Sequence, residues 1–418
     1  MKSPTYLIPG LRTPFCKVDG PLKSLDTIQM SVPVAQAMAT QVDRADLMIW
    51  GTVIPSLRWS NLAREVLLDA KLDATTPAYS TVQACSTSMV GVFEAAGMLN
   101  DHTQLAMVGG VEAMSRVQIG LTQGMSDWLR AVMQAKTFGQ RLDALTGITL
   151  GLDIPSVKNR VTGKSMGEHC EEMAQLWQIK RDAQDRIAFE SHKRAVAAMS
   201  AGFFDDLVIS VNSTSKDGIP RPDTSMERLS MLKPAFDRSG AGTITAGNAS
   251  PLTDGAAAIW VANETGMKRI TGNANIRNTV KLLDYEIAGV DIFKEGLLMA
   301  PAYAIPRLLA RNNLRLDGID LWEIHEAFAA QVLCNVTAIE NDAFVREKAG
   351  VNHDLGKFPW ERLNPNGGSV AIGHPFGATG ARILSQAAKE LAAMGPGKRA
   401  VVSICADGGL GTVALLES

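Results

Sequence analysis

The amino-acid sequence predicts a layered α/β fold, in which buried sheets are covered by helices. Short apolar runs rich in β-prone residues alternate with segments whose apolar residues recur about every 3.6 positions. The chain has 418 residues, 46% hydrophobic and 20% charged, which is typical of a soluble globular protein with two or three domains. Such alternation over this length favours sheets that are buried on both faces.

Individual elements follow from the same patterns. Four apolar runs predict buried strands, at residues 47–54, 105–114, 256–262 and 400–406, and a shorter one, LWEI, lies at 321–324. Helical periodicity with one polar face covers residues 24–41, 181–202 and 381–395. A further helix is expected over Ser86–Leu99, because Met89, Phe93 and Ala96 fall on one face.

The order of these elements predicts two similar halves and an insertion. We expect residues 1–118 to form an N-terminal half that residues 246–267 complete, and residues 268–418 to form a C-terminal half. Residues 119–245 break the alternation and contain the turn-rich stretch SKDGIPRPDTSMERLS, so an inserted lid is expected there. The acid-containing, Gly-rich strand ends GGVEAM and CADGGLG are similar in the two halves and indicate an internal duplication.

The lid sequence carries excess positive charge beside an apolar stripe. Between residues 119 and 164 there are six basic residues (Arg130, Lys136, Arg141, Lys158, Arg160 and Lys164) and three acidic ones (Asp127, Asp143 and Asp153), a balance of 6 − 3 = +3. Trp128, Leu129, Val132 and Met133 share a helix face. Two interpretations remain open: an amphipathic helix packed on the body, or a surface for a partner subunit or membrane.

Composition excludes several classes of function. The net charge of −2 argues against a general nucleic-acid binder. Five cysteines without a pairing pattern predict a reducing compartment, and no signal peptide or membrane span is recognisable, so a cytoplasmic location is expected. No HExxH motif occurs, and GEHCEE at 167–172 has no partner cluster, so no metal is expected.

Cys85 is the first candidate catalytic residue. It lies in QACSTSM, after a β-prone run and directly before the predicted helix. A free cysteine is often simply a small buried residue. At a helix N-terminus, however, the free N–H groups and the helix dipole favour a thiolate, which can attack a carbon atom.

Three more stretches contain candidate catalytic groups. His374 lies in NPNGGSVAIGHPFGATGARI, a Gly-rich turn that leads into a helix and suits a base directed at a ligand. Cys405 ends a buried strand and precedes a turn whose N–H groups are free to face an oxyanion. His325, in LWEIHEAFAAQ, ends a strand; the alternative is a helix-capping pair with Glu326. Together these groups suit acyl transfer, with a thiolate holding an acyl group as a thioester.

The chain resembles the thiolase family over nearly its whole length. The stretches that carry the resemblance occur in the family's order: LRTPFCKVDG (its N-terminal strand and turn), QACSTSM, GGVEAMS, SMGEHCEEMA, LKPAFDRSGAGTITAGNASPLTDGAAA, HEAFAA, NPNGGSVAIGHPFGATGAR and CADGGLG. The resemblance implies a five-layered α-β-α-β-α fold of two similar halves with an inserted lid that binds coenzyme A.

The resemblance also implies roles for particular residues. Cys85 would be the acyl-accepting nucleophile, His374 its base, and Cys405 the acid/base at the substrate's α-carbon. The backbone N–H groups of Cys85 and Asp407 would form one oxyanion hole, and His374 with a water held by His325 would form the other. Further contacts are implied at three positions: Ser250 at the pantetheine, and Met166 and Phe328 along the acyl pocket. Neither metal nor redox cofactor is implied; coenzyme A is a substrate.

Two positions depart from the family's usual pattern. His325 replaces the usual Asn, and HEAF together with the long lid resembles the thiolase subunit of fatty-acid oxidation multienzyme complexes. This favours a broad- or long-chain 3-ketoacyl-CoA thiolase over an acetoacetyl-CoA thiolase. Asp407 replaces the usual Gly or Ala, and an acid there is expected to raise the pKa of Cys405.

Several alternatives stay open from the sequence alone. The same site could run in the condensing direction, as an acetoacetyl-CoA thiolase, or act on a different acyl group. A ketosynthase pairs its Cys with two His but lacks a second cysteine such as Cys405. A non-catalytic lipid or CoA carrier would be expected to lose a reactive residue. The resemblance further implies a homodimer or larger homo-oligomer, with a hydratase–dehydrogenase subunit or a membrane surface as further partners.

Overall fold

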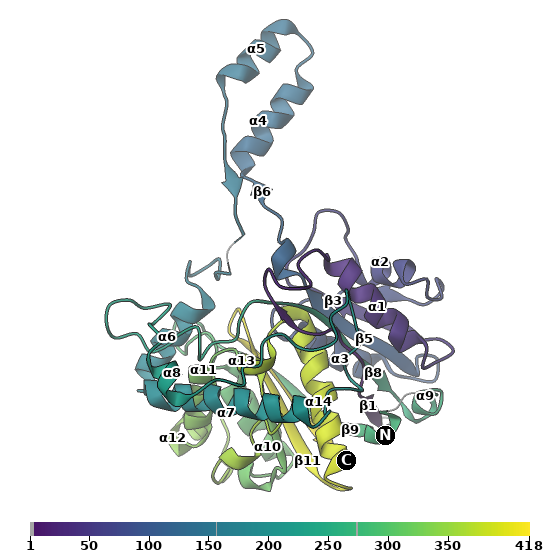
Figure 1. Cartoon of the computed structure of the whole chain (residues 1–418), viewed down its shortest axis with the longest axis vertical. Coiled ribbons are helices and arrows are strands. Elements are labelled where there is room, and N and C mark those ends of the chain that lie inside the picture. The colour runs from purple at the N-terminus through teal and green to yellow at the C-terminus, as the bar shows by residue number, and fades with distance from the viewer. Residues whose placement is uncertain (1–3, 156, 273–274) are drawn as a thin grey trace.

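The structure is a computed structural model that describes residues 4–155, 157–272 and 275–418 (Figure 1). Within these ranges, a hydrogen-bonded path of strands runs in the order β10-β11-β12-β9-β1-β8-β5-β3-β4, with β2 paired to β8. The first half-sheet contains β1 (Thr5–Ile8), β2 (Cys16–Lys17), β3 (Leu47–Gly51), β4 (Ala78–Tyr79), β5 (Leu105–Glu112) and β8 (Thr253–Ala262). The second half-sheet contains β9 (Val280–Gly289), β10 (Leu321–Ile324), β11 (Arg399–Ala406) and β12 (Leu410–Glu417).

The two half-sheets repeat one pairing scheme. In the first, β3 runs parallel to β5, β5 antiparallel to β8, and β8 antiparallel to β1. In the second, β10 runs parallel to β11, β11 antiparallel to β12, and β12 antiparallel to β9. The antiparallel pair β1–β9 joins them into one path.

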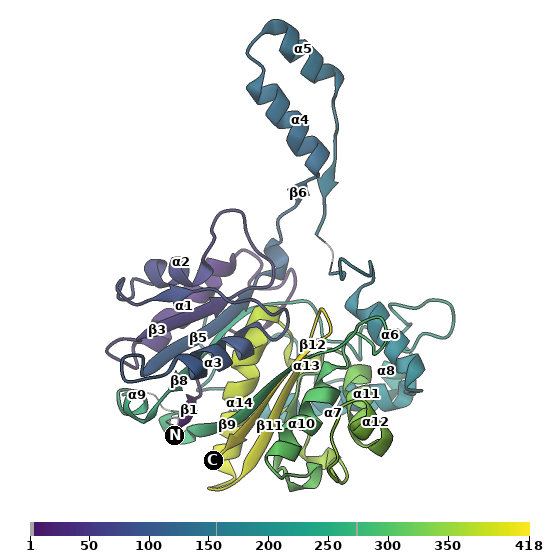
Figure 2. The same cartoon turned by 180° about the vertical axis from the view of Figure 1, so that it is seen from behind.

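Helices and half-sheets stack in five layers (Figure 2). Helices α3 (Thr87–Met98) and α14 (Thr379–Ala393) lie between the half-sheets, in a core that contains side chains from both. The outer face of the first half-sheet is covered by α1 (Thr27–Ala39) and α2 (Leu62–Asp69). The outer face of the second is covered by α10 (Ala300–Arg311) and α11 (Ala329–Ile339). Because both faces are covered, every residue of β5 and β8 is buried.

Two predicted strands end earlier than expected, for a reason visible in the hydrogen bonds. The run at 47–54 is a strand only as far as Gly51, because the N–H groups of Val53 and Ile54 donate to the Glu112 carboxylate instead of a neighbouring strand. Glu112 is also the last residue of β5. The expected N-terminal strand in LRTPFCKVDG is wrong in position: β1 precedes that stretch, which contributes only the two residues of β2.

Residues 119–245 divide into two structurally distinct parts. Helices α6 (Met166–Leu176), α7 (Arg181–Ser200) and α8 (Met226–Ser230) lie against the second half-sheet's helices, where α6 contacts α11 and α7 contacts α13 (Ser369–Ile372). The short helices α9 (Glu264–Lys268) and α12 (Asp342–Glu347) complete the body.

Helices α4 (Gln123–Gln134) and α5 (Phe138–Thr146) instead form a hairpin that projects far from the body on the two-residue strands β6 (Gly120–Leu121) and β7 (Leu152–Asp153) (Figures 1 and 2). Trp128 Nε1 donates to the Ala144 carbonyl at 2.7 Å and fastens one helix to the other. Neither helix contains a buried residue, so the interpretation of an amphipathic helix packed on the body is wrong. We call residues 120–153 the lid hairpin.

No helix in the described ranges combines the length and the apolar composition that are needed to cross a bilayer.

The contact between α14 and α3 provides a test of the central layer. A Cβ atom at Gly380 would overlap the backbone N of Met89 in α3, so Gly380→Ala should lower the free energy of unfolding by ~1–3 kcal/mol, as overpacking does. Gly97→Ala is the matched control, since this exposed glycine in α3 has nothing within 4 Å of an added Cβ. We expect that control to be neutral or stabilising, because alanine favours a helix. Equal thermal midpoints for Gly380→Ala and the parent protein would show that the helices are not in close contact.

Candidate active site

Cys85 lies in a tight turn between β4 and α3. Ala84 adopts a left-handed conformation with φ 44°, which is uncommon for a residue with a side chain. The Thr87 hydroxyl holds this turn, because it accepts from Gln83 N–H at 2.9 Å and donates to the Ala84 carbonyl at 2.7 Å. Met89 and Phe93 are buried and Ala96 packs against the same core, so the predicted helix face anchors α3. Cys85 itself stays half-buried.

His374 lies in the loop before α14. Gly373 has φ +108°, which a residue with a side chain rarely adopts, and this conformation turns the chain into the loop. His374 N–H donates to the Thr253 hydroxyl at 3.0 Å, and its Nδ1 lies 2.6 Å from the Thr379 hydroxyl at the start of α14. Glu112 accepts from Gly377 N–H at 3.2 Å and so ties this loop to the end of β5.

His325 follows β10 and is completely buried. Its N–H donates to the Ser403 carbonyl at 2.8 Å, and its Nδ1 lies 2.7 Å from the Ser369 hydroxyl. The neighbouring Glu326 accepts from Ser191, Asn364 and the N–H of Val370. The N-cap residue of α11 is Phe328, and the side-chain partners of His325 and Glu326 lie outside that helix, so the interpretation of the two residues as a helix-capping pair is wrong.

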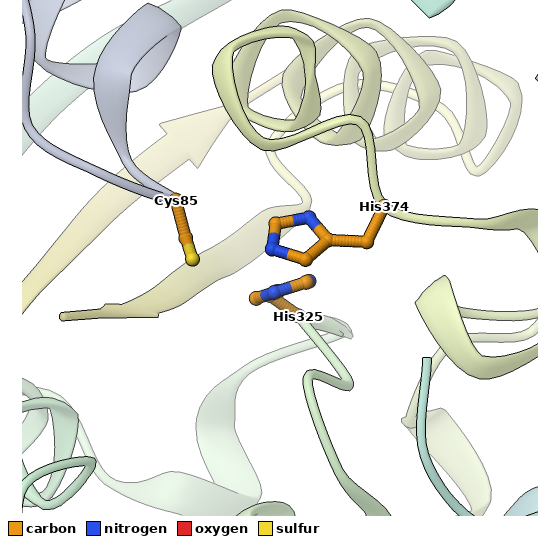
Figure 3. Close-up of side chains that lie close together, drawn as sticks. All are labelled: Cys85, His325 and His374. Carbon is orange, nitrogen blue, oxygen red and sulfur yellow. The ribbon is translucent and has the colours of Figure 1, made fainter. Parts of the chain in front are cut away.

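These three side chains meet at one point (Figure 3). The sulfur of Cys85 and one ring nitrogen from each of His325 and His374 lie within 4.8 Å of one another, and the ring centroids are 4.1 Å apart. Both Nε2 atoms are buried, and neither has a hydrogen-bond partner among the described residues. Buried polar atoms are normally hydrogen-bonded, so the two free nitrogens indicate a site for a ligand. Cysteine and histidine are also zinc ligands; the expected absence of a metal therefore stays a prediction.

Cys405 and Asp407 border the same site. Cys405 is buried near the end of β11, opposite Gly411 of β12, and Cys85 is close enough to contribute to the raised pKa of Cys405. The N–H groups of Asp407 and Cys85 both favour the ionised sulfur of Cys85. Their role as the two donors of an oxyanion hole stays a prediction.

The electrostatics differ from the sequence-based expectation in two respects. Burial raises the pKa of Cys85 to about 12, and the Asp407 carboxylate adds to this rise. The helix N-terminus was expected to lower the pKa of Cys85. Desolvation of the thiol outweighs this effect, since α3 begins only at Thr87. The second difference concerns Asp407. It was expected to raise the pKa of Cys405, but its carboxylate acts on Cys85, while burial and Cys85 raise the pKa of Cys405.

Both imidazoles are neutral at ordinary pH. Burial lowers the pKa of His374 to about 3, and the cationic Arg382 contributes to the decrease. Burial, His374 and Arg382 hold the pKa of His325 well below its usual value. The resting cluster therefore contains a thiol and two uncharged imidazoles.

The remaining predicted contacts lie beside this cluster. The Ser250 hydroxyl donates to the Ala327 carbonyl at 2.9 Å, and the adjacent Ala249 pairs with Phe328. Phe328 belongs to the same apolar cluster as Cys405, and Met166, the first residue of α6, packs against that cluster. The three positions are thus compatible with a ligand channel that approaches Cys405.

Several polar residues at the site were not identified from the sequence. Ser369, Thr379 and Arg382 lie in or beside the recognised Gly-rich motif, and Thr253 follows the Ser250 segment. Their spacing shows nothing unusual, and only the hydrogen bonds reveal them. Asn159, at the base of the lid region, donates to the Asp407 carboxylate at 2.8 Å.

Known proteins are similar to this chain over nearly its whole length. The curated 3-ketoacyl-CoA thiolase of Pectobacterium carotovorum is 34% identical, with 98% of this chain and 95% of that protein covered. That of Shewanella sediminis is 33% identical, with 98% and 96% covered. Human mitochondrial 3-ketoacyl-CoA thiolase superposes with a TM-score of 0.80 at 27% identity, covering 100% of this chain and 99% of that one.

A second solved structure, the acetyl-CoA acetyltransferase of Bacillus anthracis, has a TM-score of 0.79 at 29% identity, and 100% of this chain and 99% of that one are covered. The model of the thiolase N-terminal domain matches residues 5–265, and that of the thiolase C-terminal domain matches residues 276–418. With both models matched in order over nearly its whole length, the chain belongs to the thiolase family.

Proposed function

We propose that this chain is an acyltransferase that cleaves 3-ketoacyl-CoA with free CoA, giving acetyl-CoA and an acyl-CoA two carbons shorter, as in fatty-acid β-oxidation. The observation that carries the proposal is the meeting of Cys85 with two neutral imidazoles whose Nε2 atoms have no partner. The name 3-ketoacyl-CoA thiolase of relatives that align over 95% or more of their length supports the same substrate class.

The first half-reaction begins at Cys85. His374 removes the thiol proton, and the sulfur attacks the 3-keto carbon, whose oxygen becomes an oxyanion. The C2–C3 bond then breaks, which leaves an acyl thioester on Cys85 and the enolate of acetyl-CoA. Cys405 donates a proton to C2 of this enolate and completes acetyl-CoA. His325 stabilises the enolate oxygen together with His374.

The second half-reaction releases the shortened chain. The thiol of free CoA gives up its proton to the Cys405 thiolate that the first half-reaction leaves, and its sulfur attacks the acyl carbon on Cys85. The N–H groups of Cys85 and Asp407 stabilise the oxyanion that forms there. Collapse of this intermediate breaks the bond to Cys85, and His374 returns to this sulfur the proton that it took in the first half-reaction, so atoms and protons balance.

Ligand binding is assigned to the groups beside the cluster. Ser250 would contact the pantetheine of CoA, and Met166 and Phe328 would line the acyl pocket. The alternative is a biosynthetic acetoacetyl-CoA thiolase, which the similarity to the Bacillus anthracis acetyl-CoA acetyltransferase favours. A cytoplasmic location, a homodimer or larger homo-oligomer, and the division at residues 118, 245 and 267 complete the proposal.

The chain-length profile tests the proposed substrate class. Thiolytic rates on 3-ketoacyl-CoA substrates with four to sixteen carbons should be highest above four carbons. Cys85→Ala should abolish turnover on every substrate and leave the thermal midpoint unchanged. Activity confined to the four-carbon substrate would favour the biosynthetic alternative, and no activity on any length would reject the proposal.

Removing Cys405 should separate the two chemical steps. Cys405→Ala should still form the acyl-enzyme from acyl-CoA, because Cys85 and His374 remain. It should lose roughly 10²–10⁴ in the rate at which α-protons of acetyl-CoA exchange into deuterated water, as for the loss of a general acid/base. Cys334→Ala is the control, since this cysteine is also buried and has no assigned role. Exchange at the parent rate in Cys405→Ala would remove Cys405 from the mechanism.

The charge of Asp407 should influence the pH at which the Cys85 thiol ionises and becomes reactive. Its carboxylate raises the pKa of Cys85, so Asp407→Asn should lower that pKa and move the pH profile of iodoacetamide alkylation to lower pH. The amide keeps an oxygen for the hydrogen bond from Asn159. Asp143→Asn, on the lid hairpin, is the matched control and should not move the profile. A shift to higher pH in Asp407→Asn would contradict the assignment.

We further propose that the lid hairpin docks on a hydratase–dehydrogenase subunit. Three of its apolar side chains are largely exposed: Met133 is 84% exposed, Phe138 82% and Leu150 74%. Phe138→Glu should weaken binding in a pull-down with such a subunit, whereas Phe293→Glu, at a residue 73% exposed off the hairpin, should not. Equal binding by the parent protein and both variants would reject docking through Phe138. If the parent protein and Phe293→Glu sediment with anionic vesicles and Phe138→Glu does not, the hairpin binds a membrane instead.

A further inference from the structure

The two histidines of the site have the same kind of neighbour but different hydrogen-bonding constraints. Each Nδ1 lies next to one hydroxyl group, Ser369 for His325 and Thr379 for His374. Each Nε2 is buried and faces the ligand space without a partner. A neutral imidazole carries a proton on only one nitrogen, and the bond at Nδ1 decides which one.

The hydroxyl group of Thr379, next to His374, donates its proton to another group. Thr379 Oγ1 lies 3.0 Å from the Pro375 carbonyl, which can only accept, so the hydroxyl proton points to that carbonyl. Towards His374 the same oxygen must then accept, and Nδ1 must carry the proton. The Nε2 atom of His374 therefore has a free lone pair, as a base needs.

The hydroxyl group of Ser369, next to His325, accepts a hydrogen bond from another group. Arg382 Nη2 lies 2.7 Å from Ser369 Oγ, and a guanidinium can only donate. The hydroxyl proton of Ser369 then points to Nδ1 of His325, since no other acceptor for it occurs among the described residues. Nδ1 is therefore unprotonated, and Nε2 carries the proton.

The surroundings of Arg382 maintain this arrangement. The residue is buried, and although burial lowers the pKa of its guanidinium to about 10, it remains a cation at neutral pH. The nearby carboxyl groups of Glu323 and Glu326 raise the pKa of this guanidinium and so partly offset the effect of burial. The Arg382 cation, which donates to Ser369, disfavours a proton on Nδ1 of His325. It also lowers the pKa of His325 and so keeps the ring neutral.

We propose that Ser369 and Arg382 are positioning residues that fix His325 as a hydrogen-bond donor at Nε2, while Thr379 fixes His374 as an acceptor at Nε2. Two adjacent imidazoles thus hold opposite tautomers. His374 can take the proton of Cys85, and His325 can donate to an oxyanion without first gaining a proton. The catalytic meaning rests on the proposed function, but the tautomers themselves do not.

Nitrogen-15 spectra of the full-length protein test the assignment directly. The chain has six histidines, and the variants His325→Asn and His374→Asn identify the two sets of ring signals by their loss. Near neutral pH, His325 should show a protonated Nε2 and a bare Nδ1, and His374 the reverse. The same tautomer on both rings, or a protonated Nδ1 on His325, would overturn the inference.

Variants of the hydroxyl residues test the cause. Ser369→Ala should shift the His325 signals towards a tautomer mixture and leave those of His374 unchanged, and Ser369→Thr should restore them. Thr379→Val should shift the His374 signals towards a tautomer mixture and leave those of His325 unchanged, and Thr379→Ser should restore them. Unchanged His325 signals in a folded Ser369→Ala protein would remove Ser369 and Arg382 from this role.

Kinetics provide a second readout. Ser369→Ala should lower kcat by up to roughly 10²–10³, the effect of losing one oxyanion-hole donor, with little change in KM and with recovery in Ser369→Thr. The expected tautomers in a protein without thiolase activity would refute the proposed function and support the inference. The wrong tautomers in an active enzyme would refute the inference and support the proposed function.

Discussion

The site depends on the packing of α3 against α14 between the two half-sheets. These helices carry the Cys85 turn and the His374 loop at their N-terminal ends, so their contact determines where thiol and imidazole meet. A buried hydrogen bond of 2.9 Å from Ala381 N–H to the Ser88 hydroxyl fixes their register. Gly380 permits the close approach, because any side chain there would overlap Met89. Interiors packed this closely tolerate little displacement, which is how two distant segments hold one geometry.

Burial then determines the chemistry of the cluster. A desolvated thiol and two desolvated imidazoles are all more stable uncharged, so the resting site stores no thiolate. The charges of the reaction arise only when a substrate is bound, beside donors that are already oriented. Under the proposed mechanism, the N–H groups of Cys85 and Asp407 therefore contribute more to catalysis than a lowered pKa of the thiol would. Asp407 also joins the turn between β11 and β12 to the base of the lid region, because it accepts a hydrogen bond from Asn159.

Much of the fold could be predicted, because its central strands are long apolar runs and its central helices have clear periodicity. Strand β5 and helices α1 and α7 lie within the predicted ranges, whereas β8, β11 and α14 each begin one to three residues before theirs. Strand β9 was not singled out, since charged and exposed residues interrupt it where it leaves the core. The lid hairpin shows the converse case: α4 is strongly amphipathic, and periodicity cannot reveal that no part of the body covers its apolar side.

The candidate catalytic side chains could be identified from the sequence, whereas the residues that hydrogen-bond to them could not. Cys85, His325, His374 and Cys405 stand in distinctive motifs, whereas the partners of the imidazoles are ordinary serine, threonine and arginine residues. Which hydroxyl donates and which accepts depends on a carbonyl at Pro375 and a guanidinium at Arg382, and no spacing in the sequence encodes that difference. The pKa of Cys85 was misjudged because desolvation depends on the three-dimensional surroundings.

The most direct test of the account is to trap the acyl-enzyme. The protein would be incubated with a saturated acyl-CoA, denatured in acid, digested and mapped by mass spectrometry. The account predicts one acyl group per chain, on the peptide that contains Cys85, in the parent protein and in Cys405→Ala. An acyl group on Cys405, or none on any cysteine of a protein that turns over 3-ketoacyl-CoA, would contradict it.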